Sequence, residues 1–227
     1  MGKNTINSDA GDGSAPLRLG PRFAGALLYA LDVHGAQYRK DTAIPYISHL
    51  MAVSSLVLEY DGDEDEAVAA LLHDAAEDSD DGDEQLRRIG QEFGPRVRAI
   101  VHLCSDTVEQ PKPPWLERKQ RYIRHLNDDF GADRVDSGYL RVALADKLHN
   151  ARSIVADMRR DGDDSVFDRF NSGKDHEEKK RNTLAYYADL ARAYARYDGT
   201  DLGIRALSKE LTGAVRDLGA DEEATLG

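Results

Sequence analysis

Apolar residues recur at helical spacing along almost the whole chain from Pro21 onward. Runs that alternate apolar and polar residues between turn pairs, which would indicate strands, are hard to find. This periodicity predicts an all-α fold, a single bundle of about eight to ten helices. The expected helices cover residues 21–33, a segment from about 46, a segment that starts in DGDEDEAV and ends in HDAAED, and residues 83–92, 95–103, 115–126, 137–160, 175–197 and 202–217.

The chain has 227 residues, the size of one domain that can bury a core without disulfides or metals. Residues 1–20 hold hardly any large apolar side chains and are predicted to form a disordered leader. Residues 21–218 would then form the folded domain, and residues 219–227 a frayed tail. No stretch approaches the ~18 apolar residues that a membrane helix needs. The first residues also lack the apolar region of a signal peptide, so we expect a cytoplasmic protein.

The charge balance limits the classes of partner. Lys and Arg number 30 against 42 Asp and Glu, which gives a net charge of −12. Nonspecific binding to nucleic acid or to an anionic membrane surface is therefore disfavoured, and an anionic ligand requires a local basic patch. The chain has no glycine-rich phosphate loop, and its one cysteine, Cys104, is expected to be a core thiol.

Four polar residues follow directly on the apolar run AVAALL, in the segment HDAAED. Within it, Glu77 lies four residues after His73, and Asp78 lies four after Asp74. If the helix continues through this segment, all four side chains project from a narrow sector of one face. Carboxylates that leave a core need partners, and a divalent cation would supply one. The structural alternative is an acidic helix end that faces water.

A second candidate lies on the helix expected at 137–160, which is apolar on nearly all sides and should therefore be central and buried. Asp146 lies on this helix, and a buried carboxylate needs a metal or a cationic partner. The structural alternative is an ion pair with Arg39 or Arg152. His49, on the helix that begins after Pro45, completes a set of two His and two Asp that could hold one octahedral cation and leave positions for water.

The motifs HGAQYRK, PYISH, AALLHDAAED and LADKLHNARS contain these residues. Their order and spacing resemble the hydrolase domain of the Rel/Spo alarmone enzymes, which belong to the HD superfamily of metal-dependent phosphohydrolases. The likeness covers about residues 22–200. The segments WLERKQRY and AYYADL are also similar to stand-alone small alarmone hydrolases of the Mesh type.

The resemblance implies an Mn²⁺-dependent enzyme that holds one divalent ion, other transition metals being alternatives. Its substrate would be guanosine tetra- or pentaphosphate, from which it removes the 3′-pyrophosphate to give GDP or GTP. The metal ligands that the family positions assign are His49, His73, Asp74 and Asp146. The catalytic acidic pair, which positions and deprotonates the attacking water, would be Glu77 and Asp78. The expected substrate contacts are Arg39 and Lys40 on the guanine and ribose side, Asn150 and Ser153 near the ribose and the 5′ region, Lys147 and Arg152 at phosphates, and Tyr186 in packing.

The chain departs from the family pattern in places that bear on the base more than on hydrolysis. The departures are Leu50 in place of proline after the ligand histidine, Ala75 and Ala76 in place of two valines, and Ser79 and Ser153 in place of threonine. A pocket one methyl group looser discriminates between ligands by only about 1–3 kcal/mol. The preference for guanine over adenine is therefore less firmly specified than the reaction.

Several alternatives stay open at this point. The same site could act on an adenosine alarmone, on a pyrophosphorylated tRNA end or on the phosphate of NADPH, or the chain could bind an alarmone without cleaving it. Tyr186 is alternatively a core residue. A set of basic residues is expected to be a solvated helix face, with substrate steering as the alternative, namely Lys112, Arg118, Lys119 and Arg121. The sequence also leaves open a homodimer, the physiological metal, the choice of tetra- or pentaphosphate, and a pairing with a toxic synthetase.

Overall fold

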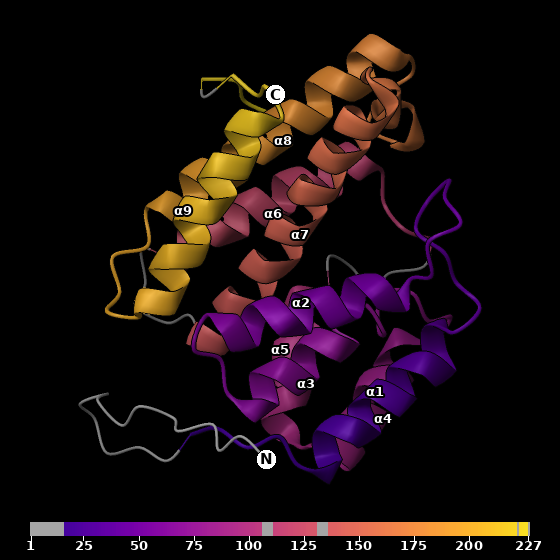
Figure 1. The fold of residues 1–227 in the computed structure, drawn as a ribbon, viewed down its shortest axis with the longest axis vertical. Helices are drawn as coiled ribbons and strands as arrows, with labels where there is room; N and C mark the ends of the chain where they lie inside the picture. Colours follow the sequence, from indigo (N-terminus) through magenta and orange to yellow (C-terminus); the bar gives the residue numbers. More distant parts are fainter. Residues whose placement is uncertain (1–15, 106–110, 131–135, 222, 227) are drawn as a thin grey trace, which may run out of the picture.

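The computed structural model describes residues 16–105, 111–130, 136–221 and 223–226. The described residues form nine α-helices and one 3-10 helix and contain no strand, so the predicted all-α fold is confirmed (Figure 1). The α-helices are α1 (Pro21–His34), α2 (Ile47–Glu59), α3 (Glu64–Leu72), α4 (Gly82–Phe93), α5 (Pro95–Cys104), α6 (Trp115–Phe130), α7 (Ser137–Asp161), α8 (His176–Ala195) and α9 (Leu202–Asp217). The 3-10 helix η1 spans Ser165–Arg169 and was not expected from the sequence.

One boundary differs from the sequence prediction. The third helix was expected to run into HDAAED, but α3 ends at Leu72, and the residues that follow form turns. The ring Nδ1 of His73 bonds the carbonyl of Ala70 at 2.8 Å, an acceptor that a continuing helix would offer to the N–H of Asp74. The polar residues of this segment therefore lie on a turn after the helix rather than on one helical face.

The chain termini are described only in part. Most of the leader expected at residues 1–20 lies outside the described residues; at its end, the N–H of Gly20 donates to Glu64 Oε1 at 2.6 Å. In the expected tail, the N–H of Leu226 donates to Asp189 Oδ2 at 2.8 Å. The bounds predicted for the leader, domain and tail stay predictions. Among the described helices, none combines the length and apolarity needed to cross a bilayer.

Acidic caps explain where several helices begin. Asp63 and Glu66 form a capping box at the start of α3, with the side chain of each bonded to the backbone N–H of the other. Asp136 accepts hydrogen bonds from the first backbone N–H groups of α7. Between α4 and α5, Gly94 has a φ of 99° and Pro95 follows at the first turn of the next helix. The sequence thus sets these helix starts through local hydrogen bonds and backbone freedom.

Helix α7 is the central element of the fold. It contacts α2, α3 and α5 as well as α9 and η1. In Figure 1 it leads from the N-terminal group of helices to the C-terminal helices α8 and α9. Residues on several sides of α7 are buried, among them Leu140, Val142, Leu144 and Leu148, as its nearly all-round apolar sequence predicted. A polar residue in the middle of α7 is therefore held in place from several directions.

A buried ion cluster ties α7 to three other elements. Arg141 is only 4% exposed. Its Nε lies 2.7 Å from Glu66 Oε2, its Nη1 donates to the carbonyl of Tyr60 at 2.7 Å, and its Nη2 lies 2.7 Å from Asp201 Oδ2. These contacts join α7 to α3, to the end of α2 and to the residue that caps α9. The cluster fixes α7, which carries Asp146, relative to α2, which contains His49, and α3, which His73 follows.

Replacing Arg141 by alanine is expected to lower the free energy of unfolding by about 3–5 kcal/mol, because it removes the buried partner of the Glu66 carboxylate and leaves the partly exposed Arg96 as its cationic contact. Urea denaturation followed by circular dichroism measures the change. Arg159→Ala is the control, since Arg159 pairs with Asp217 where both side chains are more than half exposed. That control should change stability by less than about 1 kcal/mol. A similar small effect for Arg141→Ala would contradict a structural role for the cluster.

Candidate metal centre and active site

Three elements bring two histidines and a carboxylate together. His49 lies in the first turn of α2, His73 directly follows α3, and Asp146 lies in the middle of α7. All three residues are buried, and one ligand atom from each lies within 4.8 Å of the others. Within the described residues, these three side chains form a group that could hold a metal ion. They are three of the four predicted metal ligands.

The ring of His73 has one nitrogen that could bind a cation. Its Nδ1 lies 2.8 Å from the carbonyl oxygen of Ala70, which can only accept, so Nδ1 carries a proton. Its Nε2 is buried and has no hydrogen-bond partner among the described residues. It lies 3.0 Å from Asp74 Oδ2 and 3.6 Å from Asp146 Oδ1. In the neutral ring, the Nε2 lone pair therefore faces two carboxylate oxygens, an arrangement that a divalent ion would stabilise.

Asp74, the fourth predicted ligand, lies at the edge of this group. Its Oδ2 is 3.0 Å from His73 Nε2 and 3.7 Å from His49 Nε2. The same oxygen accepts a hydrogen bond from the hydroxyl of Tyr46 at 2.6 Å. Tyr46 therefore aims the carboxylate of Asp74 toward the two imidazoles, and Asp74 fits as a ligand beside the buried three.

Asp146 is held in the charged form needed to bind a cation. Burial opposes its ionisation, but the ammonium of Lys147 and the two imidazoles keep the pKa of Asp146 well below its ordinary value. Lys147 Nζ lies 2.7 Å from Asp146 Oδ2, and Asn150 Nδ2 donates to Oδ1 at 2.5 Å. The alternative pairing of Asp146 with Arg39 or Arg152 is therefore not what the structure shows.

The predicted acidic pair lies on the turn after α3, beside two cations. Glu77 Oε1 is 3.3 Å from Lys112 Nζ and 3.7 Å from Arg118 Nη1. Asp78 Oδ1 is 3.8 Å from Lys112 Nζ. Burial, together with the negative charge of Asp74, raises the pKa of Asp78. Arg118 departs from the solvated face predicted for it, because its side chain is 13% exposed and approaches Glu77. Lys112 is exposed, as predicted, although it also lies near Glu77.

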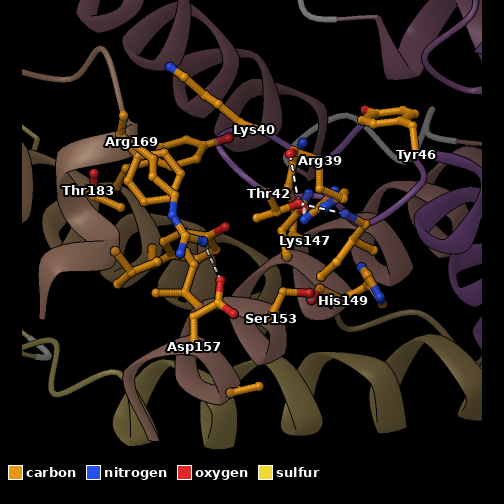
Figure 2. Close-up of a pocket in the computed structure, with 18 of the residues that line it drawn as sticks. Arg39, Lys40, Thr42, Tyr46, Lys147, His149, Ser153, Asp157, Arg169 and Thr183 are labelled. Atoms are coloured by element: carbon orange, nitrogen blue, oxygen red, sulfur yellow. Dashed lines mark hydrogen bonds and ion pairs between the residues drawn. The ribbon is translucent and has the colours of Figure 1, made fainter. Parts of the chain in front are cut away.

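Two cavities adjoin the metal-type residues. The smaller, of about 170 Å³, is bordered by His49, Asp74, Glu77 and Asp146 among others. The larger, of about 540 Å³, is shown in Figure 2, with Tyr46 and His149 at one end and Arg169 and Thr183 at the other. The residues common to both cavities are Arg39, Tyr46, Lys119, Lys147, Asn150 and Tyr186.

The structure brings six of the seven predicted substrate contacts to the larger cavity. They are Arg39, Lys40, Lys147, Asn150, Ser153 and Tyr186. Arg39 Nη2 donates to Asn150 Oδ1 at 2.8 Å, so the loop before α2 and the helix α7 meet there. Tyr186 is buried, and Lys119 Nζ lies 5.4 Å from the centre of its ring. The cavity therefore has several cationic groups along its walls.

The seventh, Arg152, is placed elsewhere. It borders a separate groove of about 440 Å³ between α7 and α9. Its Nη2 lies 2.6 Å from Glu210 Oε2, and both side chains are nearly half exposed. Arg152 follows Asn150 by only two residues, but this spacing turns its side chain to another side of the helix. The structure does not bring Arg152 to the cavity that contains the other six.

Two residues at the site were not singled out from the sequence. Tyr46 bonds Asp74, and the Nδ1 of His149 lies 2.8 Å from the Nδ1 of His49. Burial, followed by the electrostatic effects of His49 and Arg39, lowers the pKa of His149 to about 3. A spacing signal existed for both, because Tyr46 precedes His49 by three residues and His149 follows Asp146 by three, one helical turn in each case.

The sequence is similar to a known protein family and to several known proteins. A family model described as "HD domain" matches residues 26–193. A probable guanosine-3′,5′-bis(diphosphate) 3′-pyrophosphohydrolase of Synechocystis is 33% identical over 132 residues, which are 58% of this chain and 16% of that protein. The guanosine-3′,5′-bis(diphosphate) 3′-pyrophosphohydrolase MESH1 of Mus musculus is 36% identical over 129 residues, which are 56% of this chain and 65% of that one.

A solved structure shows the same fold. It is described as "A metazoan ortholog of SpoT hydrolyzes ppGpp and plays a role in starvation responses". It superposes with a TM-score of 0.64 at 24% sequence identity and covers 90% of this chain and 99% of its own. The curated relatives are matched over part of their length only, about a sixth in the Synechocystis protein and 65% in the mouse protein.

Proposed function

Because the chain belongs to the HD domain family and is related to the SpoT/Rel hydrolase domain and to MESH1, we propose that it is a metal-dependent alarmone hydrolase. It removes the 3′-pyrophosphate from guanosine tetra- or pentaphosphate and leaves GDP or GTP. The observation that carries this proposal is the buried group of His49, His73 and Asp146. His49 and Asp146 border the smaller cavity, which shares the cationic residues Arg39, Lys119 and Lys147 with the larger one. The names of the relatives support the choice of substrate.

The donor set is compatible with Mn²⁺, the ion that the family resemblance implies. Two imidazole nitrogens and carboxylate oxygens suit Mn, Fe or Zn better than Ca or Mg. When bound, such an ion supplies a Lewis acid that makes water a stronger acid near neutral pH. The residues that would hold it are His49, His73, Asp146 and Asp74, whose Oδ2 lies 3.0 Å from His73 Nε2.

Glu77 is assigned the role of accepting the proton of the attacking water. It borders the smaller cavity together with His49, Asp74 and Asp146, so a water molecule between them can reach its carboxylate. In hydrolysis, the water oxygen bonds to the phosphorus next to O3′, the P–O3′ bond breaks, and O3′ gains a proton. Lys112 and Arg118 hold Glu77 at this position. Asp78 is assigned a supporting role as the second acidic group on the same turn.

The larger cavity suits a nucleotide that carries several phosphates. Its volume of about 540 Å³ lies in the range of small-molecule sites. Arg39, Lys119 and Lys147 border both cavities and offer positive charge to the phosphates. Because the whole chain carries a charge of −12, this local group of cations supplies the attraction that the protein as a whole does not.

A substrate comparison tests the proposal. Mn²⁺-loaded protein is incubated separately with guanosine tetraphosphate, the adenosine counterpart, a pyrophosphorylated tRNA end and NADPH, and the products are separated by anion exchange. We expect pyrophosphate and GDP from the guanosine compound, at a rate about 10-fold or more above that of the adenosine compound. Faster release from any other substrate would overturn the substrate assignment. Binding of guanosine tetraphosphate with no product from any substrate would favour a non-catalytic alarmone-binding protein.

A further inference from the structure

His149 forms an unusual contact with a residue of the metal centre. It lies on α7, one helical turn after Asp146, and its Nδ1 is 2.8 Å from the Nδ1 of His49. The two ring centres are 4.8 Å apart. His49 is 1% exposed, and on the other side of its ring Nε2 lies 3.2 Å from Asp146 Oδ1. The two nitrogens of the His49 ring therefore face different partners.

The short Nδ1 to Nδ1 distance requires a shared proton. Two bare nitrogens would repel, so one ring donates and the other accepts. If His49 donates from Nδ1, its neutral ring keeps a lone pair on Nε2, the nitrogen that faces Asp146 and Asp74. If His149 donates instead, the neutral His49 ring carries its proton on Nε2 and bonds Asp146, and it cannot then bind a metal through that atom. The contact thus selects between a ligating and a non-ligating form of His49.

We propose that His149 is a positioning residue that accepts the Nδ1 proton of His49 and thereby holds Nε2 of His49 ready to bind the metal. The inference rests on the metal-dependent function proposed above and names the residue that prepares one of its ligands. Partners of this kind fix the tautomer and the orientation of a ligating imidazole. His149 also borders the larger cavity, so the residue that prepares the ligand lies between the metal centre and the space for the substrate.

Two substitutions of nearly equal size separate the chemical role from packing. Asparagine places an acceptor oxygen on Cγ, where histidine carries Nδ1, whereas leucine has the same shape without the acceptor. Mn²⁺ binding to the metal-stripped full chain is measured by the electron paramagnetic resonance signal of free Mn²⁺, with no substrate present. We expect His149→Leu to weaken Mn²⁺ binding roughly 10–100-fold and His149→Asn to restore most of the affinity. Equal affinities in all three proteins, or equal losses in both variants, would overturn the proposal.

Thermal melting of the metal-stripped proteins shows whether each variant folds. If a variant does not fold, a measurement on the unaltered protein tests the proposal instead. In the Zn²⁺-loaded protein, long-range ¹H–¹⁵N correlation spectra report which imidazole nitrogens carry protons. The proposal predicts a protonated Nδ1 on His49 and a bare Nδ1 on His149. The reverse pattern would overturn it. Because neither experiment uses a nucleotide, normal Mn²⁺ binding without alarmone cleavage would refute the proposed function and leave this inference standing.

Discussion

Alanine in place of His73 is expected to remove the metal from the protein and to lower the rate of pyrophosphate release by at least roughly 10³-fold, about 4 kcal/mol in activation free energy. His73 offers the buried Nε2 that faces two carboxylates, and no described residue bonds it. Without this ring, the site loses one of its two nitrogen ligands for the metal. Metal content after gel filtration in Mn²⁺, measured by mass spectrometry, is read together with the rate.

The control for this substitution is His176→Ala. His176 lies at the start of α8, where it pairs with Asp164 and Asp168 at a partly exposed position. The control should keep both metal and turnover. Asp74→Asn is a second variant that keeps the shape of the side chain and should also lose metal. Far-ultraviolet circular dichroism checks that the helices remain. A His73→Ala protein that holds no metal yet turns over substrate at the normal rate would contradict the account.

Glutamine in place of Glu77 is expected to lower turnover by about 10²- to 10⁴-fold while metal binding persists, because the amide cannot accept the proton of water. Glu77 borders the smaller cavity but is not one of the three residues whose ligand atoms group within 4.8 Å. Steady-state kinetics at saturating substrate, together with metal content, separate the two effects. The loss should appear in kcat, since the substrate-facing cations of the larger cavity are unchanged.

The matched control is Glu84→Gln, because Glu84 is exposed and pairs with Arg87 on α4. It should leave kcat and metal content unchanged. If Glu77→Gln loses its metal, Glu77 is a ligand rather than the proton acceptor. If it keeps normal turnover, another group accepts the proton.

The fold was predictable from the periodicity of apolar residues, and the centre of the site from its residue types and the order of its motifs. The all-round apolar pattern of α7 predicted a central helix, and that position forces Asp146 into contact with neighbouring helices. His49 and His73 are separated by 24 positions in the sequence, yet α2 and α3 pack side by side and bring their rings to 5.3 Å. Residue types, apolar periodicity and motif order were sufficient to predict the central helix and this group of metal-binding side chains.

The parts that the sequence did not predict depend on contacts across helices. The end of α3 depends on the bond from His73 to the carbonyl of Ala70, which competes with helix continuation. Arg118 was interpreted as solvated because its own helix is strongly charged, but its position against Glu77 depends on how α6 packs. Arg152 lies near Asn150 in sequence, and only the position of α9 shows that it pairs with Glu210 instead.

The most direct test of the central claim is pyrophosphate release from guanosine tetraphosphate by purified protein that has been stripped with a chelator. The release is measured with and without added Mn²⁺. Metal-dependent hydrolysis predicts release only when Mn²⁺ is present, with GDP formed in equal amount. Release at the same rate without any metal would contradict it, and so would the absence of release in a protein shown to have bound Mn²⁺.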